Sequence, residues 1–173
     1  MLTDDEIQGF LADLESDRVE RTVSTTATAK FSEAICAFSN DFPHHAAPGY
    51  LFIGVDNGGR PVRIAVTDQL RLTLAGLRDN GQIQPRPALT VQKRRVWSGA
   101  EEYEIVVIEV LPSPMPPARY EGRVWIRVGP RKAVATEAEE RVLNERRAAD
   151  LARTWDAQPW VGATPRDMSL DLF

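Results

Sequence analysis

The chain has 173 residues, of which 43% are hydrophobic and 27% charged, and its formal net charge is −4. This length suits one domain with its own hydrophobic core, and no apolar run approaches the roughly 20 residues that a membrane-spanning helix needs. We therefore expect a cytoplasmic protein that does not enter the membrane. An acidic chain does not attract a polyanion through its net charge, so any surface that binds nucleic acid must be local.

The spacing of apolar residues predicts the secondary structure in chain order. A capping box of Thr3 and Glu6 opens the first helix. Helices are predicted at about 4–14, around Phe31 up to Asp41, at 67–79 and at 136–153, and strands at 50–56, 89–97, 102–110 and 123–129. Because Ile105 to Ile108 is apolar without a break, the strand that contains it is expected to be central, with both faces covered.

The last residues, 154–173, have a loop-like composition but carry Trp155, Trp160 and the terminal pair Leu172 and Phe173. We therefore expect a domain over residues 1–153 and a tail that links it to a following domain absent from this chain. The alternative is a tail that packs on the core of its own domain.

Basic residues cluster in one segment of the chain. Residues 86–132 carry nine basic and five acidic side chains, a local charge of +4 that leaves −8 for the rest. In the strand at 123–129, alternation places Arg123, Trp125 and Arg127 on one side, opposite Val124, Ile126 and Val128. An exposed tryptophan between arginines can stack a base while the arginines contact phosphates, although an interface between subunits or chance clustering would give the same pattern.

Three carboxylates are candidates for chemistry. Glu15 and Glu20 lie five residues apart in LESDRVER, and Asp56 ends the predicted strand 50–56. Carboxylates that converge on Mg²⁺ or Mn²⁺ can support phosphodiester cleavage, whereas acids at the ends of elements are also common surface residues. A continuous strand would place the two glutamates on opposite faces, so their convergence requires a bend at Ser16 and Asp17.

Other catalytic motifs are missing. The chain has no P-loop and no Gly-x-Ser-x-Gly sequence. The adjacent His44 and His45 indicate a surface loop more than a metal site, and the single Cys36 lies in an apolar helical pattern typical of a core residue.

Several motifs in order, from about residue 14 to 147, resemble the Schlafen AlbA-type domain of bacterial proteins. These are ESDRVE, FSEAICAFSND, GYLFIGVDNGG, EIVVIEVLPSPMPP and RVWIRVGPRKAVAT. The resemblance implies an α+β fold, with helices packed on a mostly antiparallel sheet, and nucleic-acid binding. In Schlafen endoribonucleases the site is two glutamates five apart and an aspartate, which carry over to Glu15, Glu20 and Asp56.

One departure from the family pattern concerns the residues after the second glutamate. The family has Phe-Lys there, and this chain has Arg21 and Thr22. The missing lysine would lie near the metal and the scissile phosphate, so activity would require Arg21 or Lys30 to take its place.

Two main hypotheses remain. The first is a metal-dependent endoribonuclease that acts on structured RNA such as transfer RNA, in stress or phage defence, with Glu15, Glu20 and Asp56 holding Mg²⁺ or Mn²⁺. The second is a non-catalytic DNA- or RNA-binding module of a transcriptional regulator or ATPase-linked protein. In both, RNA is favoured over DNA, and the residues expected to hold it are Lys30, Arg119, Arg123, Trp125, Arg127, Arg131 and Lys132. A third option is a module that forms homodimers or binds proteins through Trp125 and the proline-rich segment 112–117.

Overall fold

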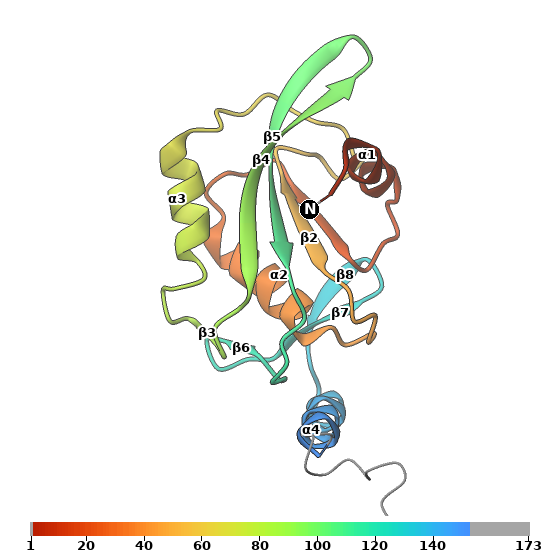
Figure 1. The fold of residues 1–173 in the computed structure, drawn as a ribbon, viewed down its shortest axis with the longest axis vertical. Coiled ribbons are helices and arrows are strands. Elements are labelled where there is room, and N and C mark those ends of the chain that lie inside the picture. The colour runs from red at the N-terminus through yellow and green to blue at the C-terminus, as the bar shows by residue number, and fades with distance from the viewer. Residues whose placement is uncertain (1, 153–173) are drawn as a thin grey trace, which may run out of the picture.

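The computed structural model describes residues 2–152, in which a four-stranded sheet lies between helices (Figure 1). The helices are α1 (Asp4–Ala12), α2 (Thr28–Asn40), α3 (Asp68–Gly76) and α4 (Glu137–Leu151). The strands are β1 (Val19–Thr22), β2 (Gly49–Ile53), β3 (Ile83–Gln84), β4 (Leu89–Ser98), β5 (Glu101–Val110), β6 (Arg119–Tyr120), β7 (Trp125–Val128) and β8 (Arg131–Val134).

Local sequence signals mark the starts of α1 and α4 and the end of α2. Thr3 and Glu6 form the expected capping box at the start of α1, and Thr136 and Glu139 form another at the start of α4. Helix α2 ends where Asp41 adopts a left-handed φ of 38°. The predicted helices are confirmed, although α1, α3 and α4 end two or three residues earlier than the apolar spacing suggests.

The central sheet has the strand order β1-β2-β5-β4. Strand β1 pairs in parallel with β2, whereas β5 pairs antiparallel with both β2 and β4. Ile105 to Ile108 on β5 are buried, which confirms the prediction of a central strand. The mostly antiparallel sheet with packed helices confirms the α+β fold class.

Alternate residues of β2 face two different parts of the core. Leu51 and Ile53 pack in the cluster that contains residues of α2 and α3, and Tyr50 and Phe52 pack in the cluster that contains residues of α1. Burial of each such side chain contributes about 1.5 to 3 kcal/mol. Because β1 and β2 are parallel, their carboxyl ends meet at the same edge, which brings the segment after β2 beside the end of β1.

A separate hairpin follows the central sheet. Strands β7 and β8 pair antiparallel and pack against α2, and Leu143 of α4 covers Val124 and Ile126. Strands β1, β3, β6 and β8 have no counterpart among the predicted strands, because each has only two to four residues, too few to show a clear alternation.

None of the helices in the described part of the chain is long and apolar enough to cross a membrane. The tail at 154–173, with Trp155, Trp160, Leu172 and Phe173, lies outside the described residues. The division into a domain and a linking tail therefore stays a prediction.

Candidate functional site

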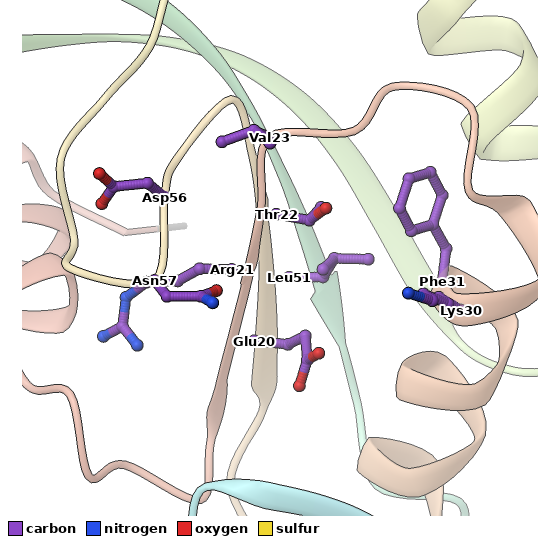
Figure 2. Close-up of a pocket in the computed structure, with 9 residues that line it drawn as sticks. All are labelled: Glu20, Arg21, Thr22, Val23, Lys30, Phe31, Leu51, Asp56 and Asn57. Carbon is purple, nitrogen blue, oxygen red and sulfur yellow. The ribbon is translucent and has the colours of Figure 1, made fainter.

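The two glutamates of LESDRVER lie on either side of a bend. Glu15 is exposed in the turn after α1, where its backbone N–H donates a hydrogen bond to Asp13 Oδ1 at 3.3 Å. Glu20 lies on β1, and in Figure 2 its side chain points to the side of the strand that faces α2, whereas Arg21 points to the opposite side. Of this pair, Glu20 lines a cavity on that side of the strand.

That cavity, which we call the β1–α2 pocket, has a volume of about 340 Å³. Figure 2 shows the residues that line it: Glu20, Arg21, Thr22, Val23, Lys30, Phe31, Leu51, Asp56 and Asn57. The pocket therefore brings together Glu20 and Asp56 of the predicted triad, but not Glu15. It lies where the ends of β1 and β2 meet the start of α2.

Asp56 organises the loop that follows β2. Its Oδ1 accepts hydrogen bonds from the backbone N–H groups of Gly58 and Arg60, both at 2.9 Å. Its backbone N–H donates to the carbonyl of Arg60, also at 2.9 Å. In Figure 2 the carboxylate of Asp56 points away from Glu20. These contacts are typical of an Asx turn, in which an aspartate holds its own loop.

Glu20 forms an ion pair with Arg127 of β7, and this corrects an expectation about the arginine. Alternation predicts that Arg127 lies on the surface, but its side chain is only 2% exposed. Arg127 donates hydrogen bonds to the Glu20 carboxylate and to backbone carbonyls of Asp17 and Val19. A guanidinium held in this way does not present its charge to a phosphate.

Lys132 of β8 is the second cation near Glu20. Its ammonium lies 3.8 Å from Glu20 and 3.2 Å from Glu33 of α2, and it donates to the carbonyl of Lys30 at 3.0 Å. The Lys132 side chain is 14% exposed. Lys132 is therefore mostly buried among partners, and its contact with nucleic acid stays a prediction.

The predicted metal ligands do not form a metal site in this arrangement. Within residues 2–152 there is no group of three or more His, Cys, Asp or Glu side chains placed to hold a metal ion. Glu15 lies outside the pocket, Glu20 already pairs with Arg127 and Lys132, and Asp56 binds its own loop. The donor set does not fit Mg²⁺ or Mn²⁺, which require several converging oxygen ligands. The catalytic role of the three acids stays a prediction.

Arg21 and Thr22, which replace the family's Phe-Lys, have different surroundings. Arg21 Nη2 donates to the carbonyls of Phe10 and Asp13 at 2.5 Å each, at the carboxyl end of α1. Burial lowers the pKa of the Arg21 guanidinium, and the charge of Asp13 opposes this shift. Arg21 is therefore a cap for α1. Thr22 lines the β1–α2 pocket, and Lys30 lines it from α2.

The remaining predicted basic residues are dispersed. Arg119 pairs with Glu140 of α4, whereas Arg123 and Arg131 are exposed. Trp125 is half-buried against the main core rather than exposed, and its Nε1 is buried without a hydrogen-bond partner. The expected surface stripe of Arg123, Trp125 and Arg127 does not exist, because α2 covers the side of the hairpin on which Trp125 and Arg127 lie.

No sequence motif identifies two of the residues in this region, Asn57 and Glu33, as part of a site. Asn57 lines the β1–α2 pocket, and Glu33 pairs with Lys132. In the sequence, Asn57 is part of Asn-Gly-Gly, which predicts a turn. Glu33 is an ordinary polar residue of a predicted helix. Only the position of Glu33, on the polar side of an amphipathic helix, was a signal that it could contact another element.

Comparisons with known proteins agree with the fold. No match was found among curated proteins. Among solved structures 17 chains match, and one is the DIP2311 protein from Corynebacterium diphtheriae, with a TM-score of 0.53 and 18% sequence identity. The match covers 79% of this chain but only 30% of that one, so this chain spans less than a third of its length. At this identity the likeness shows the fold alone.

The family model described as Schlafen, AlbA_2 matches residues 15–136, which is more than half of the chain. This range contains β1 to β8 and the whole of the β1–α2 pocket. The chain therefore belongs to the Schlafen AlbA_2 family.

Proposed function

We propose that this domain binds nucleic acid at the mouth of the β1–α2 pocket through contacts to phosphate, without metal-dependent cleavage by Glu15, Glu20 and Asp56. Membership of the Schlafen AlbA_2 family points to a function related to nucleic acid. The choice of the pocket comes from the charges around it.

The main support for the proposal is the exposed side chain of Lys30. Its side chain is exposed and lines the pocket, and no carboxylate in the described part of the chain lies within ion-pair distance of it. The two acids that line the same pocket are already bound, Glu20 by two cations and Asp56 by backbone amides. An approaching phosphate therefore meets a cation without a partner and acids whose charge is largely compensated.

The other polar groups of the pocket suit the same ligand. Thr22 and Asn57 add a hydroxyl and an amide that can donate hydrogen bonds to phosphate or sugar oxygens. Contacts of this kind fix the position of a nucleic acid without reading its sequence. We therefore expect binding with little sequence preference and with a strong dependence on salt.

Equilibrium titration of a fluorescent transfer RNA, a single-stranded DNA and a duplex DNA at several salt concentrations tests the proposal. We expect binding to each, with RNA tightest, as the family resemblance implies. Lys30→Ala should weaken binding and reduce the slope of log K against log salt by about 0.7 to 0.9, the value for one phosphate contact. The matched control is Arg141→Ala on the exposed surface of α4, which should change neither quantity.

A cleavage assay separates this proposal from the nuclease hypothesis. Transfer RNA incubated with the protein and Mn²⁺ should stay intact. Metal-dependent cleavage that is lost in both Glu20→Gln and Asp56→Asn would contradict the proposal and support the predicted endoribonuclease. Light scattering on the same sample tests the separate expectation of a homodimer.

A further inference from the structure

Arg127 connects three parts of the chain from a buried position. Besides Glu20, its guanidinium binds the carbonyls of Asp17 at 3.0 Å, Val19 at 2.9 Å and Pro130 at 2.7 Å. The guanidinium carbon also lies 5.4 Å from the centre of the Phe38 ring. All of these acceptors except Glu20 are neutral, so the Glu20 carboxylate is the counter-ion for a side chain that is 2% exposed.

These contacts replace strand pairing at one edge of the sheet. Strand β1 is an edge strand, and no strand described here pairs with its outer side. Arg127 Nη2 binds the carbonyl of Val19 on β1, and Arg127 Nε binds the carbonyl of Asp17 just before it. Backbone carbonyls at a covered edge need donors. One arginine side chain of the β7–β8 hairpin supplies them in place of a strand.

Lys132 extends the network to α2. It lies between Glu33 and Glu20 and donates to the carbonyl of Lys30, at the wall of the β1–α2 pocket. We name the four side chains Glu20, Glu33, Arg127 and Lys132 the ion-pair clamp. The clamp holds two carboxylates and two cations, so its formal charges cancel.

From this geometry we infer that Glu20 is a structural counter-ion that fixes the β7–β8 hairpin to β1 and α2, and not a metal ligand. Removal of Glu20 is costly because it leaves the charge of Arg127, whose side chain is 2% exposed, without compensation. The inference stands apart from nucleic-acid binding, since it concerns the folded state without any ligand. Its test therefore measures unfolding and metal binding, whereas the proposed function is tested by titration with RNA and DNA.

Thermal unfolding of a double-mutant set tests the clamp. We expect Glu20→Ala and Arg127→Ala each to lower Tm by roughly 10 °C. The double variant should lose less than the sum of the two single losses, because both substitutions remove the Glu20–Arg127 ion pair. The matched control pair is Arg119 and Glu140, whose side chains are 41% and 27% exposed, and Glu140→Ala should lower Tm by much less.

A metal titration covers the case in which the alanine variants do not fold. Mn²⁺ alone should leave the Tm of the wild-type protein and the lower Tm of Glu20→Gln each unchanged at every concentration. A rise of Tm with Mn²⁺ in the wild type that disappears in Glu20→Gln would overturn the inference. An unchanged Tm in Glu20→Ala without metal would overturn it as well.

Discussion

The side-chain amide of Asn40 pairs with the backbone of Ala118 in both directions. Asn40 Oδ1 accepts from the N–H of Ala118 at 2.6 Å, and Asn40 Nδ2 donates to the carbonyl of Ala118 at 2.9 Å. The same Nδ2 donates to the carbonyl of Trp125 at 2.7 Å. Asn40 is 3% exposed at the end of α2. One amide therefore joins α2 to β7 and to Ala118, which follows the proline-rich segment 112–117.

Asn40→Asp should be strongly destabilising although it changes hardly any volume. The new carboxylate would face the carbonyls of Ala118 and Trp125, to which Asn40 now donates, and a buried polar group without its partner is costly. We expect the free energy of unfolding to fall by about 3 to 5 kcal/mol, measured with urea. The control, Asn144→Asp on the exposed surface of α4, adds the same charge and should cost far less.

Gly59→Ala should disrupt the contact between the loop after β2 and α1. Gly59 has a φ of +78°, and a Cβ there would lie 1.9 Å from the carbonyl oxygen of Leu11. Gly81 has a similar φ of +77° with nothing within 4 Å, so Gly81→Ala isolates the backbone strain. We expect about 1 kcal/mol for Gly81→Ala and about 3 kcal/mol for Gly59→Ala by urea unfolding. Equal costs would show that the loop moves away from α1 without penalty.

Arg21→Met tests the role of this side chain as a cap for α1. Methionine keeps much of the packing volume but cannot donate to the carbonyls of Phe10 and Asp13. Because Arg21 is only half-buried, we expect a loss of about 1 to 2 kcal/mol in the free energy of unfolding. Arg141→Met, on the exposed surface of α4, is the control and should be nearly neutral. A neutral Arg21→Met would mean that water replaces the cap.

Cys36 should be unreactive in the folded protein. Burial raises the pKa of the Cys36 thiol from 9.0 to about 11, and its Sγ donates to the carbonyl of Ala118 at 3.3 Å. Since the thiolate is the reactive form, a thiol reagent at about pH 8 should modify the protein only after denaturation. Rapid modification of the native protein would contradict the burial of this side chain.

The same pKa shift gives a dependence of stability on pH. A group that holds its proton more tightly in the folded state favours folding at low pH, and this contribution is lost as the pH rises from about 9 through about 11. The stability of the wild type should therefore fall toward that of Cys36→Ala over this range. Urea unfolding at a series of pH values gives the free energy of unfolding of both proteins. The difference between the two values cancels the contribution of the tyrosines, which both proteins contain.

The β7–β8 hairpin shows what an alternating sequence pattern does not predict. Alternation correctly places Val124 and Ile126 on the side opposite Arg127, and both valine and isoleucine are buried as expected. It does not show that the other side is covered too. Leu143 of α4 packs on the first side, and α2 and β1 cover the second, so Arg127 is buried. A period of two tells which residues share a face, but not what lies against it.

The amino-acid sequence by itself determined the helices, four of the strands and the family. Caps, apolar spacing and turn residues act over a few neighbouring positions, so they can be read from the chain, and they predicted the helices and the central position of β5. The resemblance to the family predicted the α+β fold. Only the tertiary structure decided which distant groups meet. It placed Glu20 beside Arg127 and Lys132, left Glu15 in a separate turn, and brought Lys30 to the pocket. Ion pairs depend on distances between segments, and no local pattern encodes those distances.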